Sequence, residues 1–307
     1  MKLSVVGTLY KSSETLQEFV ERASITARQA VGDDYEIILV VDGDEESLVA
    51  AKQLPELGNQ VVLVDLSRNF GHHKAMMSGL EHSLGDLVFL IDTDLEEEPE
   101  WLLKFLSLME DHQVDVVCGV QEKRRGRLFE RISGYGFYFV FSKLTGLKVR
   151  NQVTARLMTR RYVNSLLEYK ETEVVLGGLW ALTGYAQIPA LINKGGSSRT
   201  TYSIRKRLSV AAESIVSFSN LPLVWSFYLS VAIFVGSLGF VAVLMYRYFE
   251  GAASVDGYLS VIASVWVFSA LVLLSQGIQN FYIATIFSEV KNRPRSIVRR
   301  IYGRGTS

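Results

Sequence analysis

Two long stretches without a charged side chain constrain the fold of this chain more than any other feature. They cover residues 214–246 and 257–288, and each exceeds the roughly 20 apolar residues that are needed to cross a bilayer. Both contain interior glycines and have Trp or Tyr near their ends, as membrane helices often do. A pair of long buried helices in a soluble core is the alternative interpretation. We predict two transmembrane helices, at about residues 221–246 and 258–286, within a membrane segment at 220–290.

The short link between these two helices places both of their outer flanks on one side of the membrane. "SIRKRLS" at 203–209 precedes the first helix, and residues 291–307 contain lysine and arginine but no acidic residue. By the positive-inside rule this side is cytoplasmic. We predict a juxtamembrane amphipathic helix at 204–219 and a basic cytoplasmic tail at 291–307. Because the basic residues belong to membrane-facing segments and the formal net charge is +0, the chain is not expected to bind nucleic acid.

The residues before the membrane segment, 1–203, alternate between two patterns and predict a single cytoplasmic domain. Helical stretches such as 14–30 separate short apolar runs rich in β-branched residues, and this alternation argues for an α/β fold with a mostly parallel sheet. The N-terminus is predicted to be the first strand and not a signal peptide. The single cysteine, Cys118, excludes an internal disulfide. The five predicted strands are Leu3–Val6, Glu36–Val41, Val61–Val64, Leu87–Ile91 and Val114–Cys118.

Acidic residues follow two of these predicted strands. Asp42 ends the second strand, and Asp92 and Asp94 end the fourth. In a parallel sheet ligands bind at the carboxyl ends of the strands, so these side chains should converge on one crevice. Paired carboxylates there suit a hard cation, Mg²⁺ or Mn²⁺, that takes its remaining ligands from water and from a substrate's phosphates. A solvated acidic turn is the alternative for the Asp92–Asp94 pair taken alone.

Several segments together resemble one family, the polyprenyl-phosphate glycosyltransferases, which include bactoprenol glucosyltransferase, the aminoarabinose transferase and dolichyl-phosphate mannose synthase. "SVVGTLYKSSETLQEF" is similar to the family's SVVIPVYNE opening, and "EIILVVDGDEES" to its VDDGS segment. "LSRNFGHHKAMMSGLEHSLGDLVFLIDTDLEEEPE" resembles RNxGxxxAxxxG…GDxxxxxDxDLQxPPE and is the most specific match. "SSRTTYS" resembles a GKSSY-like basic loop, and "FYIATIFSEVKNRPRSIVRR" resembles the stretch after the family's second membrane helix.

The resemblance implies a Rossmann-like GT-A head that binds a nucleotide sugar, expected to be UDP-linked, together with one Mg²⁺ or Mn²⁺ ion. The sugar would pass to a polyprenyl (undecaprenyl) phosphate with inversion of the anomeric centre. It also implies a bacterial cytoplasmic (inner) membrane protein with its catalytic head in the cytoplasm, acting in cell-envelope, O-antigen or lipid modification. Homo-oligomerisation through the lipid-facing helices stays open.

The resemblance also assigns roles to individual residues. Asp92 and Asp94 would hold the metal and the diphosphate, Asp94 being counted as catalytic, while Asp42 would contact the nucleotide base or ribose. Arg156 would face the acceptor phosphate as a catalytic residue. The residues expected near the donor's phosphates are Arg68, Arg199 and Tyr202.

The chain departs from the family pattern at several positions. Thr8 replaces the proline of the opening motif, and Val41 replaces the first aspartate of VDDGS. Thr154 in "VTARLM" replaces the aspartate of GDFRLM, so we predict Glu97 as a substitute catalytic carboxylate, against the alternative of a solvated side chain. These departures leave open a membrane-anchored nucleotide-sugar binding protein with decayed catalysis. A processive polysaccharide synthase is disfavoured because its QxxRW motif is absent from the sequence.

Adjacent histidines at 72 and 73 open the helix predicted after the third strand. Neighbouring positions on a helix point about 100° apart, so both rings cannot bind one ion from one face. We expect both to be surface or helix-cap residues.

Overall fold

A computed structural model describes residues 2–54, 60–121, 143, 152–172, 174–193, 218–249 and 257–303. The chain divides into two compact units. The head comprises Met1–Tyr138, Leu147–Thr201 and Asn292–Ser307, and the helical unit comprises Phe139–Gly146 and Tyr202–Lys291. The head therefore includes the segment for which the sequence predicts a basic tail. Apart from Phe218 and Ser219, the predicted amphipathic helix at 204–219 lies outside the described residues.

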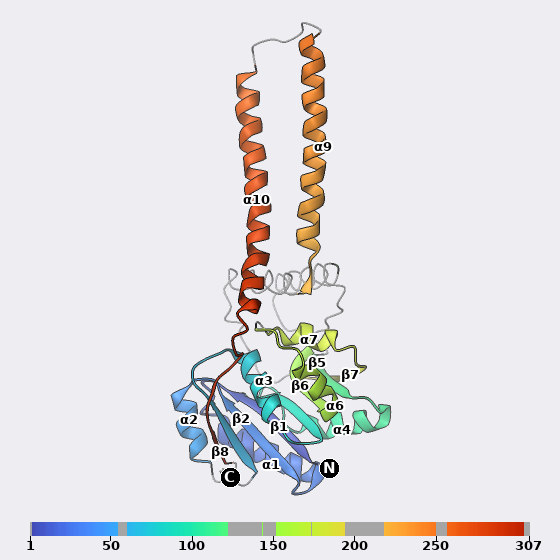
Figure 1. Cartoon of the computed structure of the whole chain (residues 1–307). Helices are drawn as coiled ribbons and strands as arrows, with labels where there is room; N and C mark the ends of the chain where they lie inside the picture. The colour runs from blue at the N-terminus through green and yellow to red at the C-terminus, as the bar shows by residue number, and fades with distance from the viewer. Residues whose placement is uncertain are drawn as a thin grey trace. The chain divides into compact units, whose positions relative to one another are not determined.

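Strands and helices alternate through the first half of the head (Figure 1). The described strands are β1 (Leu3–Leu9), β2 (Tyr35–Val41), β3 (Val61–Leu66), β4 (Leu87–Asp92), β5 (Val116–Gln121), β6 (Gln152–Thr159), β7 (Gln187–Ile192) and β8 (Val298–Tyr302). The described helices of the head are α1 (Leu16–Val31), α2 (Glu45–Lys52), α3 (His72–His82), α4 (Trp101–His112), α6 (Arg160–Leu167) and α7 (Leu176–Leu182).

All eight strands form one sheet in the order β7-β5-β6-β4-β1-β2-β3-β8. The pairs β1–β2, β1–β4, β2–β3 and β5–β7 are parallel, whereas β6 runs antiparallel to both β4 and β5, and β8 antiparallel to β3. The predicted α/β class with a mostly parallel sheet is confirmed. The sequence did not predict β6, β7 or β8.

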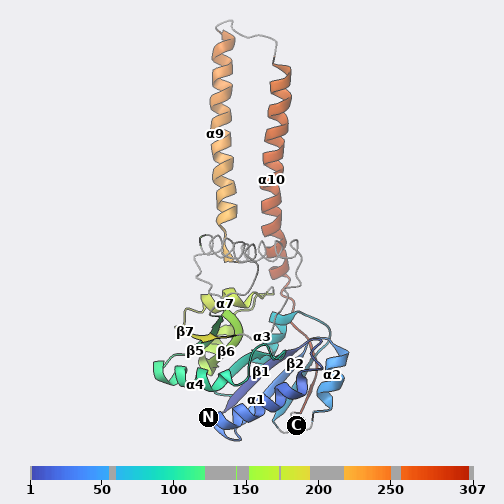
Figure 2. The same ribbon diagram turned by 180° about the vertical axis from the view of Figure 1, so that it is seen from behind.

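Helices cover both faces of the sheet (Figures 1 and 2). Phe19 of α1 and Phe105 of α4 are fully buried in the core cluster on one face, where the ring of Phe105 meets Phe89 of β4 edge-on at a centroid distance of 5.9 Å. Helix α3 covers the other face. A Cβ on Gly79 would lie 2.4 Å from a Val6 methyl carbon, so only glycine lets α3 approach β1 this closely.

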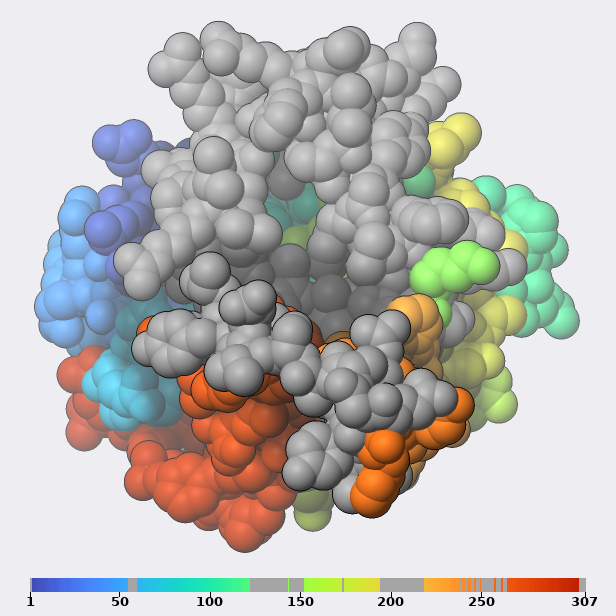
Figure 3. Space-filling view, turned by 90° about the horizontal axis from the view of Figure 1, so that it is seen from above, coloured from blue at the N-terminus to red at the C-terminus, as the bar shows by residue number. Residues whose placement is uncertain are grey.

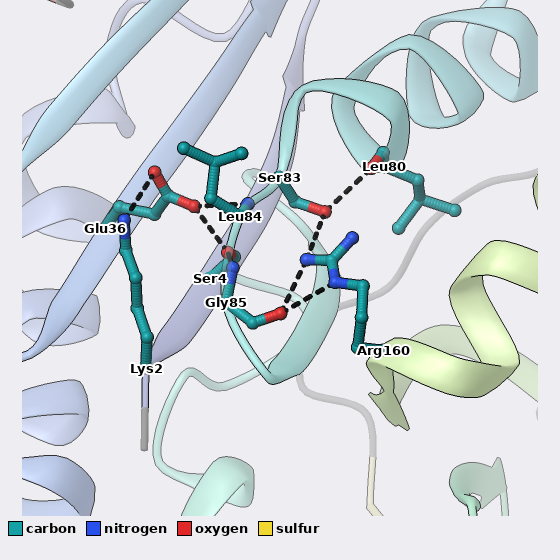
Figure 4. Close-up of polar contacts among 8 residues, drawn as sticks. All are labelled: Lys2, Ser4, Glu36, Leu80, Ser83, Leu84, Gly85 and Arg160. Carbon is teal, nitrogen blue, oxygen red and sulfur yellow. Dashed lines mark hydrogen bonds and ion pairs between the residues drawn. The ribbon is translucent and has the colours of Figure 1, made fainter.

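A buried polar network fastens the amino ends of the central strands (Figure 4). Glu36 Oε1 accepts hydrogen bonds from Ser4 Oγ and from the Leu84 amide, both at 2.6 Å. Arg160, at the start of α6, donates from Nε and Nη2 to the Gly85 carbonyl oxygen, at 2.8 and 2.6 Å. These polar groups form hydrogen bonds with one another, as buried polar groups in native proteins almost always do. The network lies at the end of the sheet opposite the carboxyl ends of the parallel strands.

Strand β8 extends the sheet beyond β3. Its Arg299 pairs with the buried Asp65 of β3, with Nε 3.1 Å from Oδ2 and Nη2 3.2 Å from Oδ1. Burial raises the pKa of Asp65 even though the Arg299 charge opposes that shift. Part of the basic tail is thus a strand whose arginine neutralises a carboxylate of the sheet.

The helical unit contains two long helices, α9 (Leu221–Phe249) and α10 (Tyr258–Val290). They lie side by side (Figures 1 and 2), and Tyr282 Oη of α10 donates to the Ser219 carbonyl just before α9. Large apolar side chains are exposed along both, among them Trp225 at 71% and Trp266 at 76%. Figure 3, which looks along the two helices, shows their side chains at the surface.

Among the described residues, one helical stretch, Ser264–Val290, is long and apolar enough to cross a membrane. The described apolar stretch of α9, Leu221–Ser237, is shorter. One candidate membrane helix is therefore present where the sequence predicts two.

Candidate active site

The carboxyl ends of β2, β1 and β4 bring the predicted donor-site residues to one edge of the sheet. The parallel register pairs Leu9 with Val41 and Thr8 with Asp92. Asp42 directly follows β2, and Asp92 is the last residue of β4. The predicted convergence of these two carboxylates at one edge is thus present, because parallel strands end at the same side of a sheet.

Asp42 is held against the loop that leads into α3. It is 3% exposed, and its two carboxylate oxygens accept hydrogen bonds from the backbone amides of Phe70, at 2.7 Å, and Gly71, at 2.9 Å. Gly43 allows this packing, because it has φ +67° and a Cβ there would lie 2.2 Å from the backbone of Arg68 and Asn69. The residue predicted to contact the nucleotide therefore shapes the loop between β3 and α3.

The Asp92-Thr93-Asp94 segment is fastened through its middle residue. Thr93 is buried and donates from Oγ1 to the Thr8 carbonyl at 2.8 Å, while its own carbonyl accepts from Thr15 Oγ1 at 3.0 Å. Asp94 is exposed, and its Oδ1 accepts from the Glu96 amide at 3.0 Å. The two aspartates thus flank a fixed threonine at the open edge of the sheet.

His72 joins the strand ends in a way that the sequence did not predict. Its Nε2 lies 3.2 Å from Asp92 Oδ1, and its Nδ1 lies 3.1 Å from Thr8 Oγ1. Burial lowers the pKa of His72, but the hydrogen bond to Asp92 and the charges of Asp92, Glu97 and Asp42 outweigh it, so that the pKa is raised. The position of His72 in the sequence could have indicated this contact, because a helix that follows a parallel strand begins at the end of the sheet where ligands bind.

His73 turns away from this contact. Its Nδ1 lies 3.0 Å from the Val174 carbonyl oxygen, which can only accept, so Nδ1 carries the proton. Burial lowers the pKa of His73. The two histidines thus have different partners, as expected for adjacent helical positions.

Glu97, the predicted substitute catalytic carboxylate, is fully buried at 0% exposure. Its Oε1 accepts from the Thr154 amide at 3.1 Å, and its Oε2 accepts from the Asp92 amide at 3.4 Å. Glu97 therefore connects the end of β4 to β6. The carboxylate of Glu97 thus lies beside position 154, where the family has an aspartate, and contacts the backbone amide of Thr154.

Arg156 lies inside the head and not at an open surface. It is 0% exposed on β6, opposite Leu90 of β4 and Cys118 of β5. Its Nη2 donates to Gln152 Oε1 at 3.2 Å, and its guanidinium stacks over the Trp180 ring. Burial lowers the pKa of Arg156 to about 10.

Two nitrogens of Arg156, Nε and Nη1, are buried without a hydrogen-bond partner among the residues that the structure describes. A buried charge with few partners is strongly unfavourable. Arg156 therefore retains unused capacity to donate hydrogen bonds to an anion.

The remaining predicted residues are placed as follows. Arg68 is exposed in the loop after β3, where it donates to the Asn69 carbonyl at 3.0 Å and lies over the Phe70 ring. Arg199 and Tyr202 lie outside the described residues. The structure thus brings Arg68 beside the loop that Asp42 holds, and it leaves the basic loop undescribed.

The donor set at the edge suits a divalent cation bound jointly with a substrate. Within the described ranges, no group of three or more His, Cys, Asp or Glu side chains could hold a metal ion by itself. Asp92 and Asp94 supply hard carboxylate oxygens, and Mg²⁺ commonly binds through one or two carboxylates plus phosphate oxygens and water. The residues present therefore fit Mg²⁺ or Mn²⁺ if a diphosphate supplies further ligands.

Comparisons with known proteins identify the family of the chain. Residues 4–173 match the family described as Glycosyl transferase family 2. A protein of Mycobacterium tuberculosis (strain CDC 1551 / Oshkosh) named as a glycosyltransferase is 40% identical over 99% of this chain and 89% of its own length. The undecaprenyl-phosphate 4-deoxy-4-formamido-L-arabinose transferase of Enterobacter sp. (strain 638) is 27% identical over 99% of this chain and 95% of its own.

Among solved structures, glucosyl-3-phosphoglycerate synthase from Mycobacterium tuberculosis in complex with Mn²⁺ and UDP-glucose aligns with 70% of this chain and 77% of its own, at 18% identity and a TM-score of 0.48. The resemblance predicted from the sequence motifs is confirmed by the family match and by the relatives. The chain belongs to glycosyl transferase family 2 and is a glycosyltransferase with a GT-A-like α/β head.

Proposed function

We propose that the protein transfers a sugar from a nucleotide sugar, with UDP as the expected nucleotide, to a polyprenyl phosphate with inversion of the anomeric centre. The observation that carries this proposal is the pair of carboxylates, Asp92 and Asp94, at the carboxyl edge of the sheet beside the loop held by Asp42. The family membership supports the class of reaction. The name of the Enterobacter relative, an undecaprenyl-phosphate transferase, supports the class of acceptor.

On the donor side, Asp92 and Asp94 are the proposed ligands of Mg²⁺ or Mn²⁺ and of the diphosphate. A divalent cation bound there would stabilise the negative charge of the leaving nucleoside diphosphate. Asp42 and Arg68 are the proposed contacts to the nucleotide, because the loop between β3 and α3 lies next to these carboxylates. Arg199 and Tyr202 remain proposed contacts to the phosphates.

On the acceptor side, Arg156 is the proposed partner of the lipid phosphate. Two of its nitrogens have no hydrogen-bond partner within the described part of the chain, which gives it the capacity to bind an anion. A phosphate monoester has its second pKa near 6, so the nucleophile is largely ionised at pH 7. Glu97 is therefore not needed to remove a proton, and its two bonds to backbone amides suit a residue that fixes the Asp92 end of β4.

The helical unit is the proposed membrane anchor. Two spans, α9 and α10, with the head on the cytoplasmic side of the inner membrane, follow from the two charge-free stretches and the flanking basic residues. Exposed side chains such as Trp225 and Trp266 suit contact with lipid. A lipid-linked acceptor requires its enzyme at the bilayer surface, which accounts for long apolar helices in the same chain as the head.

Transfer to lipid tests the proposal directly. Purified full-length protein in detergent is incubated with undecaprenyl phosphate, Mg²⁺ or Mn²⁺, and a panel of radiolabelled nucleotide sugars, and the organic phase is counted after extraction. We expect label in the lipid phase from one donor, lost with EDTA and with Asp94→Ala. The matched control is Asp33→Ala, because the carboxylate of Asp33 is 80% exposed and pairs with the nearby Arg28.

A nucleotide-sugar binding protein with decayed catalysis is the second candidate. It is favoured by one observation: the backbone of Thr154, in place of the expected aspartate, is bonded to the buried Glu97. The same assay separates the two functions. Nucleotide binding without transfer from any donor would replace the proposed transferase with this alternative.

A further inference from the structure

Three side chains contact one another in a row at the carboxyl ends of β1 and β4, where the proposed donor site lies. Thr8 Oγ1 lies 3.1 Å from His72 Nδ1, and His72 Nε2 lies 3.2 Å from Asp92 Oδ1. The three residues come from β1, the first turn of α3 and the end of β4. The ring of His72 thus connects a hydroxyl on one strand to a carboxylate on the next.

The local structure explains why these side-chain contacts form. The β1–β4 register pairs Thr8 directly with Asp92, and Thr8 is only 8% exposed, so its hydroxyl has little access to water. The carbonyl of Thr8 accepts from Thr93 Oγ1 at 2.8 Å. Gly7 makes this contact feasible, since a Cβ there would lie 2.6 Å from the Thr93 methyl carbon. Position 8 therefore touches both residues at the start of the acidic segment.

The contact depends on the side chain of Thr8, because its hydroxyl oxygen lies within hydrogen-bond distance of the His72 ring. The Thr8 hydroxyl can therefore fix the orientation of that ring.

We infer that His72, oriented by Thr8, is a positioning residue that holds the Asp92 carboxylate in place for the divalent cation and the diphosphate. The inference rests on the proposed function, because it assigns Asp92 to that site. His72 Nε2 lies within ion-pair distance of the Asp92 carboxylate, and loss of such an outer partner of a metal-binding carboxylate lowers metal affinity by about 10- to 100-fold. Thr8 acts only through the ring of His72.

Metal binding, measured without turnover, tests this inference. The free Mn²⁺ signal in electron paramagnetic resonance is titrated with full-length protein in detergent, at one fixed pH and with saturating UDP. We expect His72→Ala to raise the apparent Kd for Mn²⁺ about tenfold or more. His72→Gln should recover part of the loss, because its amide can still donate to Asp92. The control is His112→Gln, at the exposed C-terminal end of α4.

Thr8→Val removes the hydroxyl and keeps the shape of the side chain. Alone, it should weaken Mn²⁺ binding less than His72→Ala does. Combined with His72→Ala, it should add nothing further, because the threonine acts through the histidine. Full additivity of the two changes would overturn the chain of contacts that we infer.

Two further outcomes separate this inference from the proposed function. If wild-type protein binds Mn²⁺, Asp92→Asn does not, and His72→Ala binds as wild type, the positioning role is wrong and the metal site stands. If wild type and Asp92→Asn bind Mn²⁺ equally, or neither binds it, the metal site is wrong and the positioning role falls with it. Complete loss of binding in both His72 variants would instead make His72 a direct ligand, which also overturns positioning.

Discussion

Asp42→Asn separates a structural role of this carboxylate from a role in nucleotide binding. Both oxygens of Asp42 accept from backbone amides at 2.7 and 2.9 Å, and the residue is 3% exposed. Asparagine offers one oxygen acceptor and turns an NH₂ group toward the second amide. One hydrogen bond to a charged acceptor, worth about 1.5–3 kcal/mol, is lost, and a buried N–H remains unpaired. We expect the head to lose roughly 2–4 kcal/mol of unfolding free energy.

Thermal unfolding in detergent measures this loss. For a domain of this size, 1 kcal/mol shifts Tm by about 2–4 °C, so the expected decrease is on the order of 4–16 °C. Hydrogen exchange should also accelerate at the amides of Phe70 and Gly71, which lose their fixed acceptor. Asp33→Asn is the matched control, because its carboxylate is 80% exposed. An Asp42→Asn protein with the Tm of wild type but no affinity for UDP would refute this reasoning and make Asp42 a ligand contact only.

Two other predictions test the packing and the electrostatics of the head. Gly43→Ala should lower Tm more than Gly177→Ala, because a Cβ at Gly43 would lie 2.2 Å from backbone atoms and its φ is +67°, whereas nothing lies within 4 Å at Gly177. Hydrogen bonds from Arg22 lower the pKa of Glu100, so the folded head binds this proton less readily than the unfolded chain. Stability from this pair should be complete above the unfolded pKa and fall as pH drops through the lower folded pKa. Thermal unfolding as a function of pH should show this decrease in wild type and a smaller one in Arg22→Gln.

Local patterns in the sequence were sufficient for the central strands. β1 to β4 are apolar runs whose residues are almost all buried, and each is followed by a helix. Parallel connection of such strands follows from the intervening helices. The positions of Asp42 and Asp92 at one edge could therefore be predicted from the sequence.

The outer strands depend on contacts that no local pattern contains. β7 includes Pro189, and β8 is a short strand with two arginines, both of which argue against a strand when read alone. β8 forms only because β3 offers it a partner more than two hundred residues earlier in the chain. The buried position of Arg156 has the same origin, since β6 inserts between β4 and β5 and places this side chain inside the head.

The acidic residues around the end of β4 fall into two groups. Some form contacts that hold the turn after β4 in place, and the others remain available to bind a ligand. Glu97 accepts hydrogen bonds from two backbone amides, and Glu100 accepts two hydrogen bonds from Arg22 of α1 at 2.8 and 2.9 Å. These contacts fix the turn between β4 and α4. Asp94 stays exposed on that fixed turn, and Asp92 is oriented by His72. Because most of the order of this edge comes from residues other than the two aspartates, substitutions of Asp94 should change ligand binding far more than they change folding.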